Sequence, residues 1–106
     1  MDERAKAPPK APDHLSDEMK TLWSTIVDEY ELESHHVVLL RLALEARDRA
    51  EDARAILEEE GLQVEDRFGQ TRAHPMAQVR KEAENAFARL MVHLDLDGDP
   101  DPAKAR

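Results

Sequence analysis

The segment GLQVEDRFGQTRAHP, residues 61–75, lies between two long charged stretches with a helical period and predicts a short β-hairpin. Three apolar residues of the kind that strands favour occur in it: Leu62, Val64 and Phe68. Gly69 can adopt the positive φ that a tight turn requires. Pro75 stands where a helix can begin, because the first helical residue needs no N–H partner. The middle of the chain is therefore predicted as helix, hairpin (about residues 62–73) and helix.

The residues before this segment predict a first helix over about residues 17–30. Ser16 is a good N-cap, and the acidic residues Asp17 and Glu18 in the first turn suit the helix dipole. Apolar residues then recur at helical spacing, which gives the helix one strong apolar face. Trp23 is the expected packing anchor of this face.

A second helix is predicted over about residues 35–60, with Ser34 as its cap and Gly61 as its natural end. Its first half, residues 37–44, is apolar nearly all round and is expected to be buried. A third helix is predicted over about residues 75–94. The predicted fold is mainly α, a helical subunit with a short β-hairpin between two long helices.

The two long helices carry more apolar surface than a three-helix monomer can cover. A helix of 26 residues is about 39 Å long, which exceeds the width of a domain this small. Charge pairs such as Glu45–Arg49 flank a narrow stripe whose alanines allow close helix approach. We therefore predict a ring-like homo-oligomer; the alternative is a long antiparallel helix pair that covers itself. The predicted interface consists of Leu39, Leu42, Ala46, Ala50, Ala53, Leu57, Val79, Ala83, Phe87 and Leu90.

Length and composition favour one small domain. The chain has 106 residues and a net charge of −9. We expect a disordered, basic, Pro-rich arm over residues 1–14, a single helical domain over residues 15–96 and a disordered tail over residues 97–106. The sequence contains no Cys and no apolar run of signal-peptide or membrane-spanning type, so we expect a cytoplasmic protein without membrane partners.

No catalytic or metal-binding motif stands out. With three Gly and no Cys, the chain offers neither a phosphate-binding glycine loop nor a thiol nucleophile. The acidic run Asp95–Asp99 lacks the glycine and glutamate positions of a calcium loop. His35 and His36 are adjacent, whereas two-histidine metal motifs on helices need i,i+4 spacing. We expect no enzyme activity, no cofactor and no metal.

The acidic surface argues against strong DNA binding by one subunit. The candidate DNA contacts are Arg67 and Arg72, which flank the hairpin turn, together with Arg4, Lys6 and Lys10 of the arm. A ring would repeat each of these cations, so weak phosphate contacts could add. The alternatives are a solvated tail for the arm and, for the two arginines, solvent exposure or a salt bridge to Glu65 or Asp66.

The order and spacing of these patterns resemble the small subunit of phage terminase. Four segments carry the resemblance: LSDEMKTLWSTIVDEYEL (residues 15–32), ALEARDRAEDARAILEEEGL (residues 43–62), DRFGQTRAHP (residues 66–75) and the helix with Ala83, Phe87 and Leu90. The resemblance implies a non-catalytic, ring-forming subunit that recognises double-stranded DNA in a bacterial host cell. It also implies recruitment and regulation of the large terminase, the ATPase and nuclease that starts DNA packaging into a phage-like capsid.

Two departures from the family qualify this picture. The chain has no clear separate DNA-binding domain and is strongly acidic. Weak DNA binding with little specificity would suit a gene transfer agent, a phage-like particle that carries host DNA. The alternative function is a DNA-independent helical adaptor or regulator that binds a partner protein. A transcription factor using the first two helices is a third interpretation, although the start of the second helix looks like a core segment.

Overall fold

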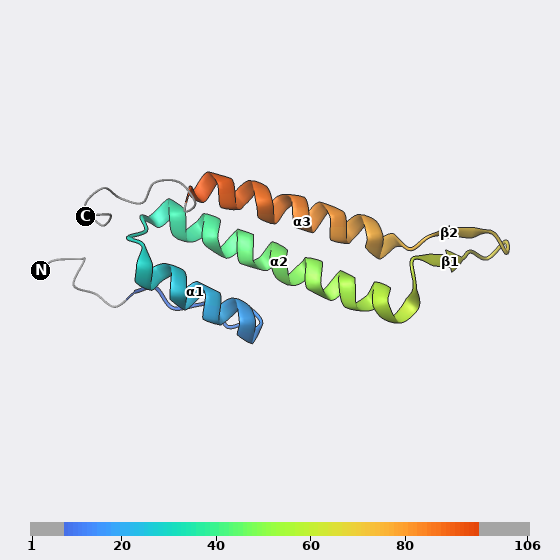
Figure 1. The fold of residues 1–106 in the computed structure, drawn as a ribbon, viewed down its shortest axis with the longest axis horizontal. Helices are drawn as coiled ribbons and strands as arrows, with labels where there is room; N and C mark the ends of the chain where they lie inside the picture. Colours follow the sequence, from blue (N-terminus) through green and yellow to red (C-terminus); the bar gives the residue numbers. More distant parts are fainter. Residues whose placement is uncertain (1–7, 96–106) are drawn as a thin grey trace, which may run out of the picture.

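The computed structural model describes residues 8–95 and consists of three helices and one hairpin (Figure 1). The elements follow in the order α1 (Asp17–Glu29), α2 (Ser34–Glu60), β1 (Gln63–Glu65), β2 (Thr71–Ala73) and α3 (Pro75–Leu94). This confirms the predicted mainly helical fold with a hairpin between two long helices. The expected tail, and residues 1–7 of the expected arm, lie outside the described residues.

Helix α1 begins at the predicted cap, and the cap also joins α1 to α2. The Ser16 hydroxyl oxygen accepts a hydrogen bond from the Met19 N–H at 3.2 Å. The same hydroxyl group and the Ser16 N–H both donate to the Asp48 carboxylate, at 2.6 and 2.8 Å. These contacts hold the start of α1 against the middle of α2.

Helix α2 begins one residue earlier than predicted. Glu33, rather than Ser34, occupies the N-cap position, and its backbone N–H donates to Nδ1 of His36 at 3.1 Å. The Glu33 side chain in turn accepts from the backbone N–H of His36, so the two residues form a capping box. Both N–H groups lack a partner within the helix, and the two side chains supply one for each. The far end agrees with the prediction, because Gly61 has a φ of 87° and donates its N–H to the Leu57 carbonyl.

Helix α3 begins at Pro75, and the residue before it links the helix to the hairpin and to α2. His74 is the N-cap of α3, and its Nδ1 accepts a hydrogen bond from the Met76 N–H at 3.0 Å. Its Nε2 lies 2.7 Å from a carboxylate oxygen of Glu60 at the end of α2. The buried His74 ring therefore fixes the base of the hairpin.

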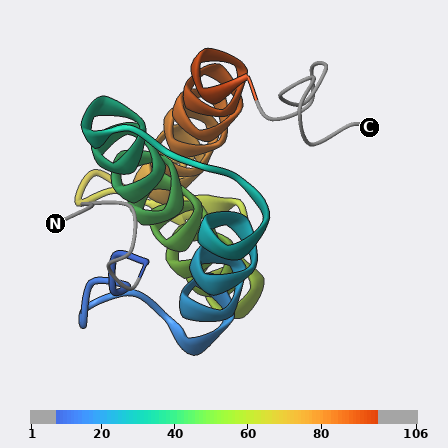
Figure 2. The same cartoon turned by 90° about the vertical axis from the view of Figure 1, so that its left-hand side faces the viewer.

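The core lies where the three helices meet, at the end of the molecule far from the hairpin (Figure 2). The side chains buried there are Leu15, Met19, Trp23, Ile26, Leu40, Leu44 and Leu94. Helix α1 reaches only the first half of α2, whereas α3 runs antiparallel to α2 along most of its length (Figure 1). The second half of the α2–α3 pair therefore has no third helix against it.

Trp23 is the anchor of this core, as predicted, and retains only 2% of its exposure. Its indole N–H donates to the carbonyl of Pro9 at 2.8 Å. Residues 8–14 therefore differ from the expected disordered arm, because the backbone there satisfies a donor that burial would otherwise leave without a partner. The Leu15 N–H also donates to the carbonyl of Pro12, which turns this segment into α1.

The molecule is long and thin. Its extents are 65 × 27 × 19 Å and its radius of gyration is 18.1 Å, whereas a compact domain of this length has about 13 Å. A rod of this shape leaves much of each helix facing water. Within residues 8–95, no helix combines the length and the apolar character that a bilayer crossing requires.

Candidate nucleic-acid and subunit interfaces

The hairpin projects beyond the ends of α2 and α3 and contains two of the predicted DNA contacts (Figure 1). Its strands pair antiparallel, with Val64 opposite Arg72 and Glu65 opposite Thr71. Because successive residues alternate faces, Val64 and Arg72 share one face of the ribbon, and Glu65 lies on the other. Arg72 is exposed.

The turn of the hairpin is held by the side chain of Asp66. One carboxylate oxygen of Asp66 accepts hydrogen bonds from the N–H groups of Phe68 and Gln70, at 2.8 and 2.9 Å. The Gly69 N–H donates to the Asp66 carbonyl at 3.0 Å, and Gly69 has the predicted positive φ of 81°. A type I turn followed by a left-handed glycine is a common closure for a hairpin loop of this length.

Arg67 and Phe68 form the outer end of the turn. Phe68 is 75% exposed, and the guanidinium carbon of Arg67 lies 5.1 Å from the centre of its ring. A cation–π contact at an exposed site stabilises by about 0.5–1 kcal/mol. The sequence predicts Phe68 as a strand residue, whereas the structure places it at the tip, outside both strands.

The predicted DNA contacts differ in their surroundings. Among residues 8–95, neither Arg67 nor Arg72 forms an ion pair, so the alternative of a salt bridge to Glu65 or Asp66 is not realised. Lys10 is exposed beside α1. Arg4 and Lys6 lie outside the described residues.

The predicted interface residues divide into two groups. Five of them are buried within the chain itself, along the contact between α2 and α3: Ala46, Ala50, Ala53, Leu57 and Ala83. They therefore pack between α2 and α3 of the same chain. The other five are half-buried or exposed: Leu39, Leu42, Val79, Phe87 and Leu90. Of these, Leu39 and Phe87 pack against the core.

One face of α2 remains open to solvent. We call Val38, Leu42 and Ile56 the open face of α2; their exposures are 47%, 39% and 37%. Val38 and Ile56 are about five helical turns apart and point the same way. Leu42 lies about 200° around the helix from the buried Leu44, so the open face is turned away from the core.

This open face corrects the expectation that residues 37–44 are buried all round. Burial of Leu40, Ala43 and Leu44 is complete, but α1 and α3 cover only two sides of α2. The exposure of Val38 and Ile56 is not among the predictions made from the sequence. The signal for them was present, because both fall on the helical side shared by Leu42 and the charged residues Arg49 and Asp52.

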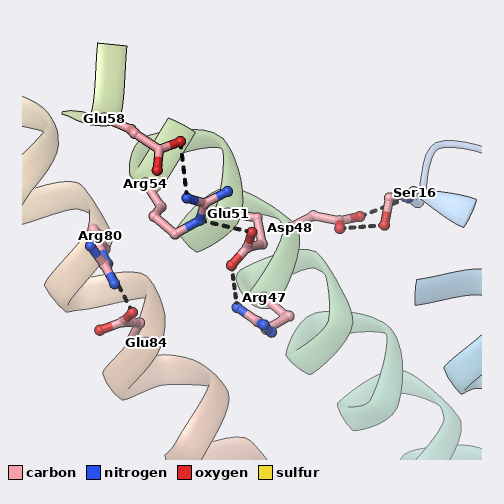
Figure 3. A network of polar contacts seen from close by, with 8 residues as sticks. All are labelled: Ser16, Arg47, Asp48, Glu51, Arg54, Glu58, Arg80 and Glu84. Atoms are coloured by element: carbon pink, nitrogen blue, oxygen red, sulfur yellow. Dashed lines mark hydrogen bonds and ion pairs between the residues drawn. The ribbon is translucent and has the colours of Figure 1, made fainter. Parts of the chain in front are cut away.

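The second half of α2, beyond the reach of α1, carries a ladder of ion pairs (Figure 3). Glu51 accepts hydrogen bonds from Arg54 at 3.1 Å and Arg47 at 2.8 Å, and Arg54 also lies 3.5 Å from Glu58. The hydrogen bond from Arg54 and then that from Arg47 lower the pKa of Glu51, and the bond to Glu51 raises the pKa of Arg54. Solvated pairs of this kind keep the helix polar and contribute little stability.

Glu45 is a charged residue of α2 that joins this helix to the segment before α1. It pairs with His14 at 2.7 Å and with Arg41 at 3.2 Å, so the expected partner Arg49 is wrong. Burial raises the pKa of Glu45, but the hydrogen bonds and the charge interactions with His14 and Arg41 together outweigh it. The net pKa therefore falls below its ordinary value of 4.5.

This shift predicts a loss of stability in acid. Because the folded-state pKa of Glu45 is below its unfolded value of 4.5, its contribution is complete above that pH. The contribution disappears as the pH falls below 4.5 toward the folded-state pKa. We expect thermal melts from pH 6 to about pH 3 to show a smaller fall in midpoint for Glu45→Gln than for the wild type. Glu59→Gln, at an exposed position of the same helix, is the control; identical pH profiles for all three proteins would contradict the assignment.

One group of potential metal ligands occurs among the described residues. Glu33, His35 and His36 place one ligand atom each within 4.8 Å of one another. They surround the start of α2, where the helix dipole disfavours a cation, and Nδ1 of His36 already accepts the Glu33 N–H. Two of the three are exposed. We assign this cluster to helix capping and not to metal binding.

Comparison with known proteins gives one match. A family model described as phage terminase, small subunit, matches residues 16–100, which is most of the chain. No curated protein and no solved structure matches it. The matched region begins at the cap of α1 and includes both long helices and the hairpin.

Proposed function

Because the chain belongs to the phage terminase small-subunit family, and so to the apparatus of phage DNA packaging, we propose that it acts there as a ring-forming, DNA-binding recruiter of the large subunit. In this proposal the protein oligomerises, binds double-stranded DNA weakly and with little sequence specificity, and recruits and regulates the large terminase. Small terminase subunits are in general non-catalytic, so the ATPase and nuclease steps belong to the large subunit. The single observation that carries the proposal is the family match over residues 16–100.

Self-assembly is supported by the shape of the subunit and by its open face. A radius of gyration of 18.1 Å means that one copy exposes long helix surfaces. On one of them the apolar side chains of Val38, Leu42 and Ile56 are exposed. Apolar surface that a neighbouring copy covers stabilises the assembly by about 25 cal/mol per Å². We propose that the open face of α2 and the half-buried side of α3, with Val79 and Leu90, meet the next subunit.

Weak DNA binding follows from the balance of charges. A net charge of −9 repels the duplex at long range. Arg67 and Arg72 project at one end and have no acidic partner among the described residues, so each copy in a ring would add two cations to a common surface. Such contacts carry no base readout, which suits packaging of unselected DNA in a gene transfer agent within the bacterial cytoplasm.

Neutralising the hairpin tests the DNA contact. Arg67→Ala with Arg72→Ala is expected to weaken binding to a duplex of any sequence. Each lost phosphate contact should also reduce the slope of log K against log salt by about 1. Fluorescence anisotropy over a salt series measures both quantities. Arg89→Ala, an exposed arginine along α3, is the matched control and should leave the slope unchanged.

A DNA-independent helical adaptor is the second candidate, and the net charge of −9 favours it. The two functions differ in one measurement. A stable oligomer that gives no gel shift at low salt and any protein concentration would support the adaptor. A shift that weakens steeply with salt supports phosphate contact.

A further inference from the structure

The tip of the hairpin has a property that phosphate binding alone does not explain. Phe68 is 75% exposed at the outer end of the turn, and the guanidinium group of Arg67, which lies over its ring, leaves most of the side chain open to solvent. A large aromatic side chain in water is unfavourable, and a hydrophilic residue would close the same turn. The exposed ring is therefore available to a ligand that takes up an aromatic side chain.

The tip is also held ready in one conformation. Asp66 fixes the backbone on both sides of the turn through its bonds to the N–H groups of Phe68 and Gln70. Gly69 supplies the left-handed residue, and the ribbon is anchored at its base by His74. A preorganised tip loses little conformational entropy when it inserts into a partner.

We propose that Phe68 is an apolar wedge that inserts between base pairs of duplex DNA, while Arg67 and Arg72 contact the flanking phosphates. This inference rests on the DNA binding in the proposed function and adds a residue and a mode of contact to it. Apolar side chains that enter between base steps unstack them and kink the duplex, and a two-stranded ribbon fits a DNA groove. Insertion of this type depends on deformability and not on base identity, in keeping with low specificity.

The charges near the tip permit this contact. The acidic end of α2, residues 58–60, lies at the base of the hairpin, about five residues or 16 Å of strand from the tip. That separation exceeds the Debye length of about 8 Å at physiological salt, so this end of α2 is largely screened from DNA at the tip. Glu65 lies on the ribbon face opposite to Arg72, and Asp66 directs one carboxylate oxygen to backbone N–H groups.

The arrangement of the two arginines favours DNA over a protein pocket as the occupant. Arg67 lies over the face of the Phe68 ring, and Arg72 lies on the ribbon face that it shares with Val64. Neither arginine has an acidic partner among residues 8–95, so the end of the hairpin presents two cations together with an exposed ring. A duplex offers phosphates on both sides of an inserted side chain. A protein pocket would need acidic groups at both places.

The test measures DNA unwinding by the full-length oligomer. Relaxed closed-circular plasmid is incubated with the protein and topoisomerase I, the protein is removed, and the linking number is read on a gel. The wild type is expected to change the linking number. Phe68→Ala should abolish the change and weaken duplex affinity about five- to hundredfold, the effect of losing one stacking contact, with the salt slope unchanged. Leu62→Ala, which removes an exposed apolar side chain at the base of the hairpin, is the matched control and should behave as wild type.

The outcomes separate this inference from the function on which it rests. If the wild type binds DNA without changing the linking number, or if Phe68→Ala unwinds as the wild type does, the wedge is wrong and DNA binding stands. Phe68→Ala that retains full DNA affinity would also overturn the wedge and leave a protein pocket as the occupant of the tip. If the wild type binds no DNA at low salt, the DNA-binding function fails and the wedge fails with it. Circular dichroism and oligomer mass confirm that each variant is folded.

Discussion

Replacing Leu42 and Ile56 together with glutamate is expected to convert the proposed oligomer into monomers. Both side chains belong to the open face of α2, and each contributes about 1.5–3 kcal/mol when it is fully covered. A glutamate at either position would place an unpaired carboxylate in the contact, which costs several kcal/mol more. Because every contact in a ring repeats the substitution, the assembly should dissociate completely at micromolar concentration. Multi-angle light scattering during gel filtration gives the mass.

The control for this experiment is Val92→Glu. Val92 is 75% exposed on α3 and lies about 180° around that helix from the buried Ala83, so it faces away from α2. This variant should keep the mass of the wild type. A double variant that also keeps the wild-type mass would show that copies meet elsewhere. A wild-type protein that is monomeric and stable to dilution would overturn the ring itself.

Replacing Trp23 with alanine is expected to cost about 3–5 kcal/mol of the free energy of unfolding. The indole is 2% exposed and packs where α1 meets α2 and the end of α3, so its removal leaves a large cavity. The change also removes the hydrogen bond that holds Pro9 against α1. Urea denaturation at a fixed protein concentration measures the loss, since the proposed self-association would make the apparent stability depend on concentration.

Trp23→Phe separates the two contributions. Phenylalanine keeps an aromatic ring in the core and loses the N–H that Pro9 accepts, so we expect a smaller loss, about 1 kcal/mol from the hydrogen bond together with some packing. The ordering alanine, phenylalanine, tryptophan is the predicted order of increasing stability. A loss below about 1 kcal/mol for the alanine variant would mean that α1 does not dock as described.

Local signals in the sequence predicted where the elements begin and end. Ser16, Gly61 and Pro75 act through their own backbone and the next three or four residues, so each marked a helix terminus correctly. Gly69 placed the hairpin turn for the same reason. The predicted N-cap of α2 is wrong because either Glu33 or Ser34 could cap the helix, and the choice depends on the hydrogen bond to the ring of His36.

Helical periodicity also established which residues share a face, and the order of elements was enough to identify the family. The alanine stripe through Ala46, Ala50 and Ala53 predicts a surface that another helix can approach closely. Which helix approaches it was decided only by the tertiary structure. There α3 of the same chain covers the stripe, and Val38, Leu42 and Ile56 are left as the open face.

For the charged groups too, the sequence shows the local contacts and only the tertiary structure shows the distant ones. The sequence shows that Glu45 can reach partners one helical turn away, but only the docking of the segment before α1 brings His14 to it. Asp48 is likewise an ordinary helix carboxylate until Ser16 lies against it. Helix caps and turns depend on a few neighbouring residues, and one chain segment contains all of them. The partner of a helix face depends on where distant segments of the chain lie. Here α1 covers only the first half of α2, because α1 starts from its N-cap Ser16 and Ser16 lies against the middle of α2.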